Sequence, residues 1–145
     1  MNIIFKEINK ENWEECIDLE VSNDQKKFVA LNWYSILQAK FGEKLYPLGI
    51  YDNETMIGFL MYDFDPETSR WELSRFMIDK KYQRKGYGKL SMIHLVKFLK
   101  NKLGNIKFYL SVEPKNLIAQ KLYENIGFKK TGEIMWHEEV MVIEL

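Results

Sequence analysis

Residues 71–91 constrain the fold more than any other stretch of this sequence. Trp71 to Ile78 is rich in apolar, aromatic and β-branched side chains, which predicts a buried strand. From Met92 onward, the apolar residues recur at the i, i+3, i+4, i+7 spacing of a helix with one buried face. A short basic loop, residues 83–88, connects the two. We therefore expect a strand that leads through a tight loop into an amphipathic helix.

This loop has the chemistry of a pyrophosphate site. Gly86 and Gly88 allow the backbone to approach a ligand closely and to adopt φ/ψ values that other residues avoid. The first N–H groups of the following helix are unpaired and lie at the positive end of the helix dipole, which favours an anion. Nearby basic side chains strengthen this field, namely Lys80, Lys81, Arg84, Lys85 and Lys89. A Gly-x-Gly turn alone is more often a basic surface turn, so a second feature has to support the interpretation.

Two better-known phosphate-binding loops do not match the sequence. A nucleoside-triphosphatase loop has Ser or Thr after Gly-Lys, but Leu90 follows Gly88 and Lys89 here. A dinucleotide-binding loop needs a third glycine, and Ser91 stands at that position. The loop therefore predicts a different class of diphosphate ligand.

Length and charge limit the function further. The 145 residues, 46% of them hydrophobic, predict one domain, residues 1–145, with one sizeable core. No stretch is long enough to cross a membrane, and residues 1–10 lack the features of a signal peptide. With Cys16 as the only cysteine, no intrachain disulfide can form, and we expect a cytoplasmic location. Twenty-one basic residues balance 21 acidic ones, which argues against nucleic acid as the main partner.

The rest of the chain alternates between predicted strands and helices. Strands are expected at 2–8, 45–51, 56–62, 106–112, 128–134 and 140–145. Helices are expected at 9–20, at 21–41 as one helix or a broken pair, and at 117–126. In the first helix, Trp13, Cys16 and Ile17 are predicted to point inward. This order predicts an α/β fold in which helices pack on a mixed sheet.

A second motif lies about thirty residues after the basic loop and has the form Asn-x-x-Ala-x-x-Leu-Tyr-x-x-x-Gly-Phe, from Asn116 to Phe128. Together with Gln83-x-x-Gly86-x-Gly88, it resembles the GNAT acetyltransferase superfamily, strongly over residues 71–131 and loosely elsewhere. Within the superfamily, the chain looks most similar to the bacterial spermine/spermidine (diamine) acetyltransferases. The strings that carry this narrower resemblance are residues 19–25, 75–79 and 140–145.

The resemblance implies a fold and a cofactor. The fold would be a mostly antiparallel sheet of about six or seven strands, splayed into a V and flanked by about four helices. The cofactor would be acetyl-CoA, wedged between the strands at 71–78 and 106–112, with its pyrophosphate on the basic loop. The residues assigned to it are Phe76, Met77, Ile78, Gln83, Arg84, Lys85, Gly86, Tyr87, Gly88, Lys89, Asn116, Ala119 and Lys121. The family also often forms homodimers, so a homodimer is expected.

The resemblance also implies catalytic roles in an acetyl transfer by direct attack within a ternary complex. Tyr123 would protonate the departing thiolate of coenzyme A; its alternative role is that of a core tyrosine. Glu72 would be the base that frees the amine. Polyamine acetyltransferases often have a carboxylate where Ser74 stands, so the base assignment stays open, and a water relay from Glu72 past Ser74 is the alternative.

The acceptor is expected to be a small-molecule amine, with a polyamine as the leading candidate. From Glu11 to Asp24 there are six acidic residues and no basic one, which forms either a solvated helix face or a wall that attracts cations. Carboxylates with aromatic faces behind them suit a polycation. The predicted wall comprises Glu14, Asp18, Glu20, Asp24, Trp33, Tyr34, Glu72 and Ser74.

Three alternatives remain open at this point. The acceptor amine is a protein N-terminus or lysine in one reading and an aminoglycoside in another. In a third, the chain is a non-catalytic acyl-CoA sensor, although the presence of both Tyr123 and Glu72 argues against it. No metal is expected, because His94 and His137 lie far apart in the sequence.

Overall fold

The computed structural model describes all 145 residues, which form a seven-stranded sheet of order β1-β2-β3-β4-β5-β7-β6. The strands are β1 Ile3–Glu7, β2 Leu45–Asp52, β3 Thr55–Asp65, β4 Arg70–Ile78, β5 Lys107–Val112, β6 Lys129–Met135 and β7 Glu138–Glu144. The helices are α1 Trp13–Asp18, α2 Asn32–Phe41, α3 Tyr87–Leu103 and α4 Leu117–Ile126, with short 3-10 turns at Asn23–Gln25 and Lys80–Tyr82. The predicted mixed fold, with its V-shaped sheet and flanking helices, is confirmed.

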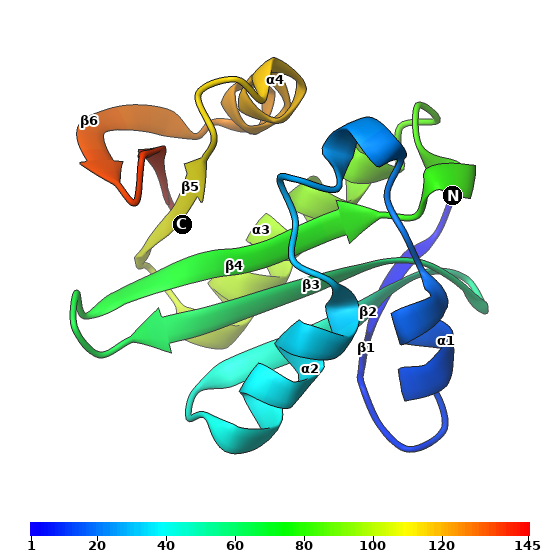
Figure 1. The fold of residues 1–145 in the computed structure, drawn as a ribbon. Coiled ribbons are helices and arrows are strands. Elements are labelled where there is room, and N and C mark those ends of the chain that lie inside the picture. Colours follow the sequence, from blue (N-terminus) through cyan, green and yellow to red (C-terminus); the bar gives the residue numbers. More distant parts are fainter.

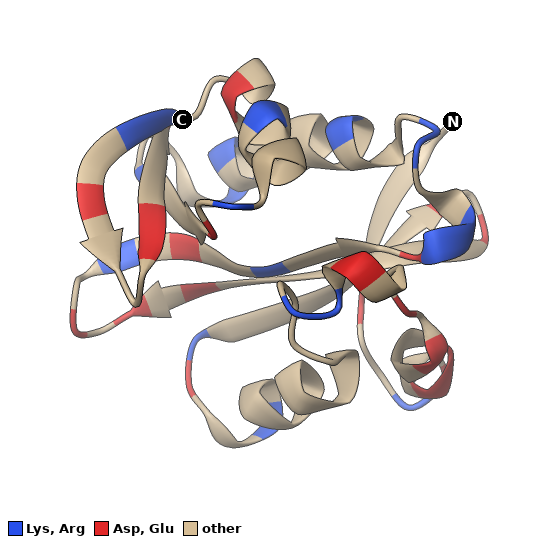
Figure 2. Ribbon diagram, turned by 45° about the horizontal axis from the view of Figure 1, so that its top comes forward, with Lys and Arg blue, Asp and Glu red and all other residues tan.

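The helices cover both faces of the sheet. Helices α1 and α2 lie on one face, whereas α3 and α4 lie on the other (Figures 1 and 2). On the α3 side, Met92, Leu95 and Leu99 are fully buried at the helical spacing that the sequence predicts. On the α1 side, Cys16 is fully buried against a smaller cluster that includes Phe59 and Met61. The sheet therefore has a separate apolar layer on each face.

Strands β4 and β5 are the only parallel neighbours in the sheet, and they pair over a short distance. Their register joins Trp71 to Phe108, Glu72 to Tyr109 and Leu73 to Leu110. Beyond this point the two strands separate, as Figure 1 shows between the green β4 and the yellow β5. The edge of β4 from residue 74 to 78 that faces β5 therefore has no strand partner.

The pairing of β3 with β4 contains an irregularity. Met61 lies opposite Arg75 and Tyr62 opposite Leu73, so Ser74 between them has no partner in the register. An extra residue of this kind is a β-bulge, which bends a strand and redirects a side chain. Because of the bulge, Ser74 reaches the same side of the sheet as Asp63 and donates its hydroxyl hydrogen to the Asp63 carboxylate.

The first helix is shorter than predicted. It begins at Trp13, because the side chains of Asn9 and Asn12 each accept a hydrogen bond from the other's backbone N–H in the preceding turn. Trp13 and Ile17 were expected to point inward, but they are 43% and 36% exposed. A helix of six residues offers one narrow buried position, which Cys16 occupies. The region 21–41 forms the broken pair, a 3-10 turn followed by α2.

No helix in the structure combines the length and the apolar character needed to span a bilayer.

Candidate active site

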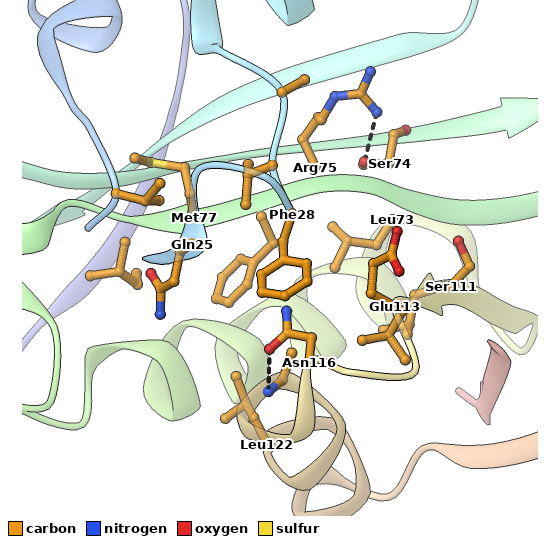
Figure 3. A pocket seen from close by; sticks show the side chains of 18 of the residues that line it. Gln25, Phe28, Leu73, Ser74, Arg75, Met77, Ser111, Glu113, Asn116 and Leu122 are labelled. Carbon is orange, nitrogen blue, oxygen red and sulfur yellow. Dashed lines mark hydrogen bonds between the residues drawn. The ribbon is translucent and has the colours of Figure 1, made fainter. Parts of the chain in front are cut away.

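A cavity of about 870 Å³ occupies the notch where β4 and β5 separate. Its walls come from β3, β4, β5, the N-terminal end of α3 with the loop before it, α4 and the segment 21–30, and α2, β2 and β7 add single residues. Figure 3 shows Phe28 of that segment near Asn116, the N-cap residue of α4. Parts of the chain that are distant in sequence therefore enclose one space.

The basic loop forms one end of the cavity. Arg84 and Gly86 both have positive φ angles, 62° and 91°, which fold the loop tightly before α3. Gly86 is the N-cap residue of α3, and no side chain caps this helix end. A Cβ added at Gly86 would meet no atom within 4 Å, so the space beside the loop is open. The exposed helix end is therefore free to bind an anion.

The Gln83 side chain fixes the loop to the rest of the cavity. Its amide nitrogen donates to the carbonyl of Ile78 at 2.8 Å and to the side-chain oxygen of Gln25 at 2.8 Å. Gln83 thus joins the end of β4 to the segment 21–30. Sequence reasoning assigned Gln83 to the cofactor; the structure gives its amide hydrogens to these two partners.

Most residues that the sequence assigns to the cofactor line the cavity. These are Phe76, Met77, Ile78, Gln83, Arg84, Gly88, Asn116 and Ala119. Residues Lys85, Gly86, Tyr87, Lys89 and Lys121 are not part of its lining. The Tyr87 hydroxyl donates to Asp52 at 2.6 Å, away from the cavity, and Lys121 is exposed on α4. The structure therefore brings the strand end, part of the loop and the start of α4 together.

Helix α4 places a capping residue and a tyrosine at the cavity. The side-chain oxygen of Asn116 accepts the N–H of Ala119 at 3.2 Å, which caps the helix. Tyr123 lies two turns further, is 9% exposed and packs edge-to-face on Phe128. Burial, with a smaller contribution from the charge of Glu138, raises the pKa of the Tyr123 phenol well above its usual value. Tyr123 therefore stays protonated at neutral pH.

Two carboxylates lie side by side on the β3–β4 wall. Glu72 is directly opposite Asp63 in the register, and both side chains line the cavity. Burial is the largest cause that raises the pKa of Glu72 to about 8, and the neighbouring Asp63 charge is the next. Burial also raises the pKa of Asp63, although the hydrogen bond from Ser74 opposes this shift. The wall thus combines two acidic groups that cannot both ionise easily.

The acidic residues of the predicted substrate wall lie mostly elsewhere. Of Glu14, Asp18, Glu20 and Asp24, only Asp24 lines the cavity. Glu20 forms ion pairs with Lys80 at 2.7 Å and Lys26 at 3.7 Å on the surface. Trp33 and Tyr34 are outside the cavity, and each is 49% exposed. Of the predicted wall, the cavity thus contains Asp24, Glu72 and Ser74.

Sequence reasoning missed several residues that line the cavity. The polar ones include Gln25, Asp63, Ser111, Glu113 and Glu138. Asp63 had a signal, since it is the first charged residue after the apolar run from Met56 to Tyr62. Ser111, Glu113 and Glu138 depend on how β5 and β7 approach the notch, and Gln25 depends on how the segment 21–30 folds over it; composition reveals neither. No group of three His, Cys, Asp or Glu side chains is arranged to hold a metal ion.

Comparisons with known proteins agree with this geometry. The family model described as "Acetyltransferase (GNAT) family" matches residues 5–128. The chain belongs to the GNAT family of acetyltransferases. It is 34% identical, over the full length of both chains, to the probable spermine N(1)-acetyltransferase of Bacillus subtilis subsp. natto. It has the same identity and coverage with the spermine/spermidine N(1)-acetyltransferase of Bacillus subtilis strain 168.

Solved GNAT-like structures share the fold. The spermidine N-acetyltransferase of Vibrio cholerae, in complex with CoA and spermine, matches 99% of this chain and 95% of its own, with TM-score 0.76 and 16% identity. The PaiA N-acetyltransferase of Thermoplasma acidophilum, in complex with coenzyme A, matches all of both chains with TM-score 0.71 and 19% identity. A domain from Methanocaldococcus jannaschii matches 99% of both chains with TM-score 0.77 and 22% identity.

Acetyl-CoA, the cofactor of this family, fits the cavity in three respects. The uncapped end of α3, with Arg84 beside it, suits the charged diphosphate. The edge of β4 beyond Leu73 has no strand partner and is available to an extended amide-containing chain. Apolar side chains, among them Phe28 and Leu122, supply walls for its methylene groups. The residues of this chain therefore match the chemistry of the cofactor.

Proposed function

We propose that this GNAT acetyltransferase transfers an acetyl group from acetyl-CoA to a primary amine of a polyamine, with spermidine and spermine as the best acceptors. The main support is the 34% identity, over the whole chain, to Bacillus proteins named as spermine or spermine/spermidine N(1)-acetyltransferases. The cavity wall adds chemical support, because Asp24, Asp63 and Glu72 offer carboxylates to a polycation.

The chemistry divides between two sides of the cavity. Bound acetyl-CoA supplies an activated acyl group in the form of a thioester. A primary amine has a pKa of about 10, so freeing its lone pair at neutral pH costs about 4 kcal/mol. Glu72, on the β4 wall, is the residue that we assign to accept the amine proton. The Tyr123 hydroxyl, on the α4 side, holds the proton that the leaving group needs.

An acceptor panel tests this proposal. The purified protein is incubated with acetyl-CoA and, separately, spermine, spermidine, a short diamine, a lysine-containing peptide, a peptide with a free N-terminus and an aminoglycoside, and thiol release is recorded. We expect the highest kcat/KM with spermidine or spermine. Activity confined to a peptide or to the aminoglycoside would contradict the polyamine assignment. Cofactor binding without turnover of any amine would indicate an acyl-CoA sensor instead.

We further propose that residues 1–145 act as a single domain in the cytoplasm and assemble as a homodimer. The fully buried thiol of Cys16, which has no partner cysteine, is compatible with a reducing compartment. Light scattering coupled to gel filtration tests the assembly, since the 17.4 kDa chain and its dimer differ twofold in mass.

A further inference from the structure

Asp63 occupies a position in the cavity to which neither the family motifs nor the sequence analysis gave a role. It lies on β3, is 6% exposed, and stands directly opposite Glu72 on β4. The Ser74 hydroxyl, displaced by the β-bulge, donates to the Asp63 carboxylate. This hydrogen bond holds Asp63 in a fixed orientation beside Glu72, and both side chains line the cavity.

The two carboxylates have no cation of their own. Arg70, the nearest arginine to Glu72 in sequence, binds Glu133 through two hydrogen bonds of 2.7 and 3.0 Å. Arg70 also lies over the ring of Tyr109, the β5 residue opposite Glu72, with its guanidinium carbon 4.2 Å from the ring centre. The arginine, at the start of β4, is thus engaged with Glu133 of β6 and Tyr109 of β5.

Arg75 is engaged in a similar way. Its guanidinium donates to the backbone carbonyl of Ser74 at 2.8 Å and to Gln38 at 3.1 Å. Both arginines are near enough to moderate the charge of the pair, while Asp65 on the same strand as Asp63 adds to it. Neither arginine forms an ion pair with Asp63 or Glu72. Two buried carboxylates without a paired cation are costly unless they share a proton or meet a cationic ligand.

We propose that Asp63 and Glu72 act as one proton-accepting unit for the acceptor amine, with Ser74 as the residue that positions Asp63. This inference rests on the proposed acetylation of an amine and names a second residue for it. The same two carboxylates would form a binding site for a single ammonium group on the cavity wall.

The proton balance of this unit is simple. Before the amine enters, the pair holds one proton and carries one negative charge, which attracts the ammonium group. One N–H bond of the ammonium then breaks, and an O–H bond forms on the ionised carboxylate. The pair now holds two protons and is neutral, while the amine nitrogen has regained its lone pair. Burial raises the pKa of both carboxyls, to about 8 for Glu72, so the pair still holds one proton at neutral pH. The raised pKa of Asp63 also makes the ionised form of the pair a better proton acceptor than an exposed aspartate.

The test compares Asp63→Asn with Asp65→Asn, which removes a neighbouring charge that does not line the cavity. The pH dependence of kcat/KM is measured with the best acceptor of the panel, and binding of acetyl-CoA checks that each variant is folded. We expect Asp63→Asn to lose at least about 100-fold in kcat/KM. The limb of the wild-type profile near pH 8, where the pair loses its last proton, should move to lower pH, because Glu72 no longer faces a like charge. Asp65→Asn should stay within about threefold of the wild type, as surface substitutions usually do.

Two results would overturn the inference. One is an Asp63→Asn variant as active as Asp65→Asn; the other is a loss of activity with no movement of the limb near pH 8, which would indicate a structural role. If Asp63→Asn does not fold, Asp63→Glu, which keeps a carboxylate at this position, replaces it and should retain the limb near pH 8.

A titration without turnover separates this inference from the proposed function. With carboxyl-¹³C aspartate and glutamate, NMR should detect a carboxyl group in the wild type that stays protonated to near pH 8. That signal should be absent in Asp63→Asn and present in Asp65→Asn. If no wild-type carboxyl titrates in this range, the shared proton is excluded. If one does and no amine is acetylated, the proposed function fails by itself.

Discussion

Leu73 of β4 lies opposite Leu110 of β5, and this is the last position at which the two parallel strands pair. The next residue, Ser74, is bulged, and β4 continues to Ile78 along the cavity without β5 beside it. The same point of the sheet therefore ends a strand pairing, redirects Ser74 and opens the notch. The cofactor side and the carboxylate side of the cavity begin within a few residues of each other.

The backbone conformation of Gly86 should be needed for acetyl-CoA binding by the loop. Alanine at its φ of 91° is strained by roughly 1–2 kcal/mol, and relaxing the loop would move the N–H groups at the start of α3. Gly86→Ala should therefore weaken acetyl-CoA binding by about tenfold, measured by calorimetry. Gly104→Ala is the matched control, because Gly104 also has a positive φ in open space but lies at the other end of α3. Equal weakening of binding in both variants would exclude a specific role for the loop.

Tyr123 should be essential for turnover but not for cofactor binding. Tyr123→Phe removes only the hydroxyl group from a buried ring, so the packing on Phe128 is kept. We expect kcat to fall by at least about 100-fold while the Kd for acetyl-CoA stays the same. Tyr46→Phe, outside the cavity, should keep full activity. A fully active Tyr123→Phe enzyme would leave Tyr123 as a packing residue.

The carboxylate pair predicts how stability depends on pH. Since the folded protein raises the pKa of Glu72 from 4.5 to about 8, the folded state binds more protons than the unfolded state between these values. Its contribution to the free energy of unfolding is therefore lost as pH rises through that window. The Tm of ligand-free wild type should fall between pH 5 and pH 8 more than that of Glu72→Gln. Glu124→Gln, at an exposed site on α4, should behave like the wild type; identical pH curves for all three proteins would refute the shift.

The buried hydrogen bonds of Asp79 should contribute more to stability than the exposed ion pair next to them. Its carboxylate is 4% exposed and accepts the backbone N–H of Glu20 at 3.1 Å and of Lys81 at 3.0 Å. Asp79→Ala leaves both N–H groups without this partner and should cost about 1–3 kcal/mol in chemical denaturation. It should also raise KM for the amine, because the segment that follows Glu20 lines the cavity.

The control for Asp79→Ala is the ion pair between Lys80 and Glu20, which joins the same two segments of the chain. Lys80→Met removes the pair between Lys80 and Glu20, both about half exposed, and should cost less than about 1 kcal/mol. If Lys80→Met destabilises the protein as much as Asp79→Ala, the buried hydrogen bonds are not what secures the segment.

Local patterns predicted the elements well wherever they follow a regular period. Leu117–Ile126 was predicted as a helix with the bounds that α4 has, because Asn116 caps it and Gly127 ends it. The strand, loop and helix at 70–103 also follow the sequence closely. By contrast, the acidic stripe of α1 was open to two interpretations, and Glu14 and Asp18 lie outside the cavity. Helical spacing shows that the charges share one face of the helix, but it does not show whether this face borders solvent or the cavity.

The carboxylate wall required the tertiary structure. Polyamine acetyltransferases often have a carboxylate where Ser74 stands in this chain, and Asp63 lies beside that serine on the neighbouring strand. The bulge at Ser74 sets which residues of β3 and β4 are opposite each other. A shift of one residue in this pairing would place Asp63 on the other face of the sheet. Since sequence alone does not specify this register, the pair of Asp63 and Glu72 could not be predicted.

Calorimetric titration of the purified, folded protein with acetyl-CoA tests most directly whether the notch between β4 and β5 is a cofactor site. We predict saturable binding of one acetyl-CoA per chain, weakened by added salt because we expect its diphosphate to bind at the positively charged end of α3. A folded protein that takes up no acetyl-CoA at any accessible concentration would contradict the assignment of the notch, and with it the roles of Tyr123 and Glu72.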